Sequence, residues 1–234
     1  MFKKIIVFYV VTMLCASIAY GTEIKYKFNH NTCFPTNWYA APVSARTSII
    51  NRRNISKIDA ATKVFRSKYP PGVIDRSLSE IYVFGELEFY GKNFGATYSA
   101  DKIYIRYNDY RFSDYPSLPV RQLHHEFSSV LMKKYGFPKS EWVSKNKGAY
   151  VSKDKGRDML STLGRDEHAY LFKKGFLTSY GSADFENDVN IYAEYVFVFP
   201  DKLDRLGKKY PVVAAKTKMI RNFYCGISKG FSFC

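Results

Sequence analysis

The order of the predicted strands and helices constrains the fold of this chain more than any other feature. Two stretches rich in aromatic and β-branched residues, 79–90 and 102–107, alternate as strands do, and a glycine-rich turn at 91–95 separates them. One helix is predicted before them, over residues 55–68. Further helical segments are predicted near residues 118–135, 158–174, 184–199 and 212–224. Because strands come first and most helices follow, the sequence predicts an α+β fold with a mainly helical C-terminal half.

The N-terminus has the features of a secretory signal peptide. Two lysines precede an apolar run over residues 5–19, and Ala19-Tyr20-Gly21 places small residues at the two positions that signal peptidase reads. The run is shorter than the roughly 20 apolar residues that a membrane span needs, which disfavours the alternative of a retained anchor helix. We therefore expect residues 1–21 to be a signal peptide. Residues 22–234 would then form a single exported domain, periplasmic or secreted, without a transmembrane span.

The composition is that of a globular protein with a strong basic surplus. Hydrophobic residues make up 46% and charged residues 24%, which excludes a disordered tail, a coiled coil and a polytopic membrane protein. The formal net charge is +15, which favours an anionic partner. Export and the lack of an RNP-type motif argue against nucleic acid. We therefore expect an anionic surface, such as lipid or a cell-wall polymer, or an acidic partner.

Three cysteines remain after the predicted cleavage: Cys33, Cys225 and Cys234. Since the number is odd, at most one intramolecular disulfide can form, and an oxidising compartment would permit it. Either Cys225–Cys234 or Cys33–Cys225 is compatible with the sequence. No Cys/His spacing predicts zinc held by thiolates.

The candidate chemistry lies on the helix predicted over residues 118–135. A His-Glu pair, His125-Glu126, is half of the HExxH arrangement, in which two histidines at i and i+4 hold zinc and the glutamate polarises the attacking water. Here the i+4 position is Ser129, a poor zinc ligand. A His-Glu pair on a helix is common and does not by itself identify a metal site. The preceding strand at 102–107 strengthens the interpretation, because zincin clefts are built from such a strand and helix.

A second segment, residues 174–199, carries a family resemblance. It reads Thr178-Ser179-Tyr180-Gly181, then Asp184-Phe185-Glu186-Asn187-Asp188, then Tyr192-Ala193-Glu194-Tyr195-Val196-Phe197. With the His-Glu helix before it, the chain over about residues 102–224 resembles the Mlc-titration-factor and anthrax-lethal-factor-like branch of the gluzincin metallopeptidases. The resemblance implies a zincin-like α+β fold, with a small mixed sheet, an active-site helix and a Zn²⁺ cofactor.

Matched position by position, the resemblance implies roles for four residues. His125 falls on the first zinc ligand and Glu126 on the general base. Tyr180 falls on a tyrosine that approaches the zinc and can stabilise the oxyanion. Ser129 falls on the second ligand, where these families have histidine. His168 or the neighbouring His124 could replace it, although a solvated helix histidine and a packed core histidine are the simpler interpretations.

The third ligand falls on Asn187 when it is counted from Tyr180 without gaps, and carboxylates stand on both sides, at Glu186 and Asp188. A shift of the helix start by one residue would make Glu186 the ligand, and we predict Glu186 or Asp188 as the metal-binding carboxylate. A structural interpretation also fits: Asp184 can cap the helix, and the two acids complement its positive end.

Two functions follow from these matches. The first is an exported zinc-metallopeptidase-like hydrolase, with His125 and a carboxylate near 186–188 on zinc and Glu126 and Tyr180 assisting, acting on a protein or peptide. The second is a catalytically degenerate relative without metal that serves as a binding or interaction module. Ser129 and Asn187 favour the second. The retained His-Glu pair and Tyr180 favour the first, towards which the sequence leans slightly.

Overall fold

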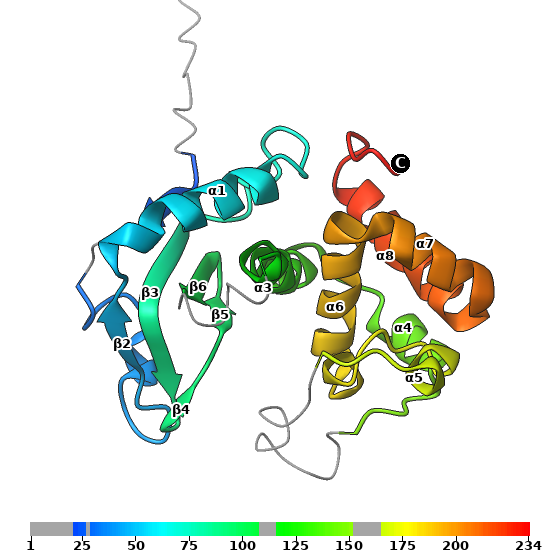
Figure 1. Ribbon diagram of the computed structural model, residues 1–234, viewed down its shortest axis with the longest axis horizontal. Coiled ribbons are helices and arrows are strands. Elements are labelled where there is room, and N and C mark those ends of the chain that lie inside the picture. Colours follow the sequence, from blue (N-terminus) through cyan, green and yellow to red (C-terminus); the bar gives the residue numbers. More distant parts are fainter. Residues whose placement is uncertain (1–20, 27–28, 108–115, 152–164) are drawn as a thin grey trace, which may run out of the picture.

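A computed structural model describes residues 21–26, 29–107, 116–151 and 165–234. It has an α+β architecture, in which a sheet lies on one side of helix α3 and a group of helices on the other (Figure 1). The strands are β1 (Glu23–Lys25), β2 (Arg46–Ile49), β3 (Glu80–Phe89), β4 (Lys92–Asn93), β5 (Ala96–Ser99) and β6 (Lys102–Arg106). The α-helices are α1 (Ile55–Arg66), α3 (Leu118–Tyr135), α4 (Lys139–Lys145), α5 (Ala169–Lys173), α6 (Phe185–Val198), α7 (Pro200–Lys209) and α8 (Pro211–Ile227).

The sheet is mixed, and β3 is its central strand. Strands β1 and β6 flank β3 in parallel, whereas β2 and β4 pair with it antiparallel. Strand β5 continues the sheet beyond β6 as the antiparallel arm of a hairpin. The predicted strands at 79–90 and 102–107 are therefore confirmed as β3 and β6. The α+β class is confirmed with them.

The two faces of β3 bury different kinds of side chain, because successive residues of a strand point to opposite faces. Ile81 and Val83 face the main core, which also holds the buried faces of α1, α3, α6 and α8. Tyr82 and Phe84 face a separate aromatic cluster beneath the N-terminal segment. That cluster consists of Cys33, Phe34, Tyr82, Phe84, Leu87, Phe89 and Tyr104.

Helix α3 lies at the centre of the molecule, with α1, β5 and β6 against one side and α6 against the other (Figure 1). Every residue from Gln122 to Met132 is buried. Leu123, Phe127 and Val130 pack in the main core. Helix α6 contacts another face of α3, so that His125, Glu126 and Ser129 lie within a helix–helix interface.

The described part of the C-terminal half is mainly helical, as predicted. Of the helix predicted near residues 158–174, residues 158–164 lie outside the described ranges, and the described part is helical only over α5. Helices α6 and α8 fall where the sequence placed them, and Asp184 caps α6 by accepting a hydrogen bond from the backbone N–H of Asn187 at 2.8 Å. Helix α7 was not predicted. A disulfide joins Cys225 and Cys234, whereas Cys33 is a buried free thiol. In the described ranges no helix is long and apolar enough to cross a membrane.

Candidate functional site

The candidate site is the interface between α3 and α6, which are joined by two polar contacts one helical turn apart. His125 contacts Glu194, and Ser129 contacts Asn190. Each pair of residues on a helix is spaced i, i+4, so the side chains lie one above the other on the same face. Since the numbers rise along α3 as they fall along α6, the helices run antiparallel. This arrangement places the HExxH positions opposite Asn190 and Glu194.

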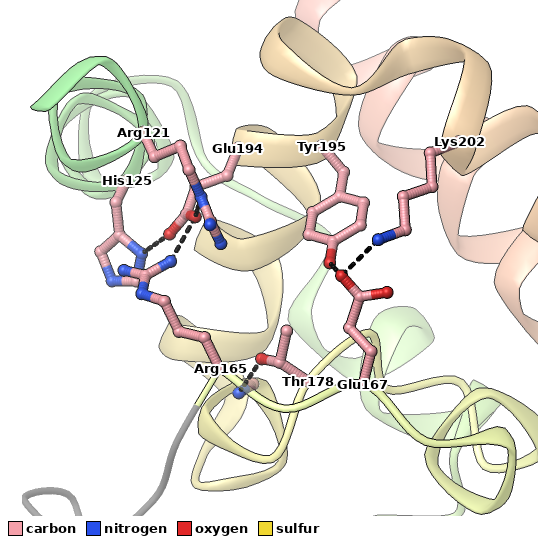
Figure 2. Close-up of polar contacts among 9 residues, drawn as sticks. Arg121, His125, Arg165, Glu167, Thr178, Glu194, Tyr195 and Lys202 are labelled. Atoms are coloured by element: carbon pink, nitrogen blue, oxygen red, sulfur yellow. Dashed lines mark hydrogen bonds and ion pairs between the residues drawn. The ribbon is translucent and has the colours of Figure 1, made fainter. Parts of the chain in front are cut away.

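Glu194 is the anchor of the site and is completely buried. Its Oε1 accepts a hydrogen bond from His125 Nδ1 at 2.8 Å, and its Oε2 accepts from Arg121 Nε at 2.7 Å and from Arg165 Nη1 (Figure 2). Burial alone would raise the pKa of this carboxyl, but Arg165, His125 and Arg121 outweigh burial and hold the pKa below its usual range. Glu194 is therefore ionised.

The tautomer of His125 follows from this contact. An ionised carboxylate can only accept hydrogen bonds, so His125 Nδ1 carries the proton. Nε2 is the ring nitrogen that does not contact Glu194, and in the neutral tautomer it carries the lone pair. This carboxylate–histidine contact is the arrangement that orients a metal-binding histidine in zinc enzymes.

The second contact joins two neutral side chains. Asn190 Nδ2 donates a 2.7 Å hydrogen bond to Ser129 Oγ, and the two residues are only 2% and 1% exposed. Ser129 stands where HExxH has its second histidine, and the α6 residue that meets it is an amide. Neither side chain supplies the imidazole or carboxylate that zinc sites use.

Glu126 and Tyr180 lie close to His125. Glu126 is 9% exposed, and burial raises the pKa of its carboxyl to about 7, opposed by His125 and reinforced by Glu186. The Tyr180 ring centroid lies 5.9 Å from that of His125, and the Arg165 guanidinium lies 5.7 Å from the Tyr180 ring centroid. Burial also raises the pKa of Tyr180. The structure thus brings together the three residues to which the resemblance assigned ligand, base and oxyanion roles.

The predicted third-ligand region is used mainly to build the helix. The side chain of Asn187 donates to the capping Asp184 at 2.8 Å, besides the backbone contact already described. Glu186 accepts a hydrogen bond from the Tyr98 hydroxyl at 2.5 Å, which ties the start of α6 to β5. Since the electrostatics of Glu186 also reach Glu126, Glu186 borders the site.

Asp188 belongs to a different cluster, on the face of α6 that meets α4 and α8. Its Oδ2 accepts from Lys216 Nζ at 2.5 Å, Trp142 Nε1 at 2.9 Å and the Tyr150 hydroxyl at 2.8 Å. Asp188 and Lys216 are both fully buried, and burial raises the pKa of the first and lowers that of the second. The structure gives Asp188 these partners and does not bring it to His125, so its predicted ligand role is not supported by its position.

The two histidines considered as substitutes also lie elsewhere. His124 is fully buried, meets the Tyr69 hydroxyl at 3.0 Å and stacks on Phe197 at 4.6 Å between ring centroids. Burial lowers the pKa of His124 to about 3, so it is a neutral core residue. His168 is exposed at the start of α5 and stacks against Tyr170.

The residues present do not fit zinc. Over the ranges that the structure describes, no three His, Cys, Asp or Glu side chains are grouped so that they could hold a metal ion. Sequence reasoning missed Asn190, Glu194, Arg121 and Arg165. One signal was available: Asn190 and Glu194 repeat on α6 the i, i+4 spacing of His125 and Ser129 on α3.

Comparisons with known proteins point to one family. The family described as "Putative zinc-binding metallo-peptidase" matches residues 16–223. A crystal structure titled as a putative zinc-binding metallo-peptidase from Bacteroides caccae is similar in fold, with a TM-score of 0.57 and 14% sequence identity. That match covers 91% of this chain and 81% of the other. No curated protein matches the chain.

Proposed function

The chain belongs to the putative zinc-binding metallo-peptidase family, and from this premise we propose that it is a member without a zinc centre that acts as a binding module for a protein or peptide. The zincin-like interpretation of the sequence supports the same scaffold. At the α3–α6 interface the chain keeps the first histidine of the HExxH pattern, His125, and has Ser129 in place of the second.

The observation that carries the proposal is the hydrogen bond between Ser129 and Asn190. A zinc site of this type needs three protein ligands, which are neutral imidazoles, thiolates or carboxylates. Ser129 and Asn190 occupy adjoining positions on the facing helices and satisfy each other at 2.7 Å. The interface is therefore closed by a neutral pair at the level where a second and a third ligand would stand.

The rest of the site is retained and supports a binding role. The buried carboxylate of Glu194 holds His125 and two arginines in one network (Figure 2). A network whose members are all engaged holds its side chains in one geometry. Glu126 lies beside this network, forms no hydrogen bond within the described ranges and is 9% exposed, and we propose that its carboxyl meets the bound molecule.

We also propose that the protein is exported. The disulfide between Cys225 and Cys234 supports this, because such bonds persist in oxidising compartments. The predicted signal peptide, residues 1–21, lies almost entirely outside the described residues.

The test is a gain of zinc binding. The native protein, the single variants S129H and N190E, and the double variant S129H/N190E would be stripped of metal, reconstituted with Zn²⁺ and analysed by metal content and calorimetry. We expect no stoichiometric zinc in the native protein and about one zinc per chain in the double variant, because only that variant places both a second histidine and a new carboxylate at the facing positions 129 and 190. S129A/N190A is the matched control, since it breaks the same contact without adding ligands.

Stoichiometric zinc in the native protein, lost in His125→Ala, would overturn the proposal. It would return the protein to the metallopeptidase interpretation, with Glu126 as base and Tyr180 assisting. Peptide hydrolysis by the native protein that E126Q abolishes would have the same meaning.

A further inference from the structure

Two segments of the C-terminal half contain basic residues and no acidic ones. Residues 205–234 contain no Asp or Glu, and neither do residues 168–183. Lys216 and Arg221 are engaged, by Asp188 and Asp204 respectively. The other cations of these two segments form no ion pair within the ranges that the structure describes. They are Lys173, Lys174, Arg205, Lys208, Lys209, Lys218 and Lys229.

A groove of about 540 Å³ lies between α5 and the junction of α7 with α8, and two of these lysines, Lys173 and Lys209, line it. We call it the basic groove, and it is lined by Ala169, Lys173, Lys209, Tyr210, Pro211 and Val212. Lys174 and Lys208 adjoin the two lining lysines, and all four are exposed. Figure 1 shows α5 beside the end of α7, away from the α3–α6 interface.

The packing of α5 makes this groove a fixed feature. Leu171 and Phe172 are buried, and Phe172 contacts Tyr210 with ring centroids 5.4 Å apart. Gly175, with a φ of 81°, turns the chain so closely over α8 that a Cβ there would stand 2.4 Å from Val212. Because the buried side chains fix both walls, Lys173 and Lys209 face the same groove.

An exposed aromatic ring stands next to the lysines. Tyr170 is 56% exposed and lies three residues, about one helical turn, before Lys173. Its ring stacks on His168, with 5.4 Å between centroids and 12° between planes. Much of the Tyr170 ring faces solvent, where a flat or ring-shaped ligand can pack against it.

We propose that the basic groove binds an acidic polysaccharide. The four lysines would contact the anionic groups of successive sugar units, and Tyr170 would pack against a sugar ring. The volume is in the range of pockets that hold small ligands, about 300–1,000 Å³. It therefore fits a short stretch of a polysaccharide chain.

Other polyanions fit the groove less well. A bilayer is flat and would touch the rims of a groove, leaving the lining residues out of contact. A single-stranded nucleic acid binds by stacking successive bases on several aromatic rings. Among the described residues of α5 and of the α7–α8 junction, Tyr170 is the only exposed aromatic residue. An acidic polysaccharide can lie in the concave groove, place its separated charges against the lysines and pack one sugar ring on Tyr170.

The test uses defined probes on the full mature chain. Binding of fluorescent oligogalacturonate, a carboxylated chain, would be measured by anisotropy between about 50 mM and about 200 mM salt. The variants are K173Q/K174Q/K208Q/K209Q and, as a matched control, K63Q/K68Q/K147Q/K229Q, which removes the same charge from exposed sites outside the groove. We expect the groove variant to lose affinity by tenfold or more and the control by less than twofold. Tyr170→Ala should weaken binding without changing the salt dependence.

Three outcomes would overturn the proposal. Equal losses in both quadruple variants would show that net charge alone attracts the polymer. No binding by the native chain at low salt would remove the ligand class. Displacement of the probe by phosphatidylglycerol vesicles or single-stranded DNA at lower concentrations than by unlabelled oligogalacturonate would assign the groove to another polyanion. Circular dichroism of each variant separates these results from unfolding, and zinc reconstitution is independent of all of them.

Discussion

The side-chain amide of Asn190 donates a 2.7 Å hydrogen bond to the hydroxyl of Ser129, and this contact spans the α3–α6 interface in full burial. We expect Ser129→Ala to lower the free energy of unfolding by about 1–3 kcal/mol, because it leaves the Asn190 amide buried without a partner. Asn190→Ala should cost a similar amount. The measurement is urea denaturation.

The double variant S129A/N190A measures the interaction free energy between Ser129 and Asn190. Since both partners are absent in it, we expect its loss to fall short of the sum of the single losses by about 1 kcal/mol. Ser144→Ala, which removes an exposed hydroxyl bonded to a backbone carbonyl, is the control and should change stability by less than about 0.5 kcal/mol. Additive single losses would contradict the direct contact.

Glu194 should be the most sensitive residue of the network. We expect Glu194→Gln to lower the free energy of unfolding by about 3 kcal/mol, because it leaves the two arginines with no carboxylate. Glu167→Gln is the matched control: Glu167 pairs with Lys202 and contacts Tyr195, but at the surface (Figure 2). Its loss should stay below about 1 kcal/mol.

The pH dependence of the Glu194 effect has a fixed sign. The pKa of its carboxyl is lower in the folded chain than in the unfolded chain. Its stabilisation is therefore complete above the unfolded pKa of about 4.3 and is lost as the pH falls below it. Unfolding at pH about 7 and at pH about 3 should show the difference between native and E194Q shrinking at the lower pH. A constant difference would mean that the charge of Glu194 is not what stabilises the site.

Much of the fold could be predicted from the sequence, because local residue patterns determine these strands and helices. Strands β3 and β6 alternate, α3 begins and ends where the helix was predicted, and Asp184 caps α6 as expected. Helix α7 was missed since it begins at Pro200, where the preceding helix was taken to end. Most residues of α7 are charged or polar, and only Leu203 and Leu206 pack against the core, which gives a weak helical pattern in the sequence.

The site was harder to predict, because helix pairing is a tertiary property. Counting from Tyr180 placed the third ligand at Asn187, but the structure uses Asn187 to satisfy Asp184 and brings Asn190 to Ser129. The sequence did not reveal that Asp188 pairs with Lys216, because the two residues are far apart along the chain, and Asp188 therefore remained a candidate ligand. Arg165, likewise, joins Glu194 from a segment with no motif of its own. The register between α3 and α6 decides the contact of Ser129 with Asn190, and the packing of α8 and of the segment before α5 against α6 decides the contacts of Lys216 and Arg165.

The predicted cleavage after Gly21 has a consequence for stability. The backbone nitrogen of Thr22 donates to Asp75 Oδ1 at 2.9 Å, and this contact lowers the pKa of Asp75. Cleavage there would turn the nitrogen into an ammonium group beside the carboxylate. We expect Asp75→Asn to destabilise a chain that begins at Thr22 more than one that retains Tyr20-Gly21, by less than about 1 kcal/mol because Asp75 is partly exposed.

This effect should depend on pH at both ends. The low folded pKa of Asp75 means that its contribution is lost as the pH falls below about 4. An ammonium group that gains a partner has a raised folded pKa, so its contribution is lost as the pH rises above about 8. Thermal denaturation of the two chain forms across this range provides the measurement. Equal pH profiles would exclude an N-terminal ammonium at Asp75.

The disulfide should stabilise the C-terminal loop through the unfolded state. Cys225 and Cys234 are nine residues apart, and closing a loop of that size contributes about 2–3 kcal/mol by the chain-entropy estimate. The loop also places Phe231 in the core, against Tyr224 and Tyr69. We expect C225S/C234S to unfold at lower urea concentration. Reductant should shift the native protein to the same midpoint and leave the double variant unchanged. A shift of the double variant by reductant would show that Cys33, buried in the aromatic cluster, takes part in another bond.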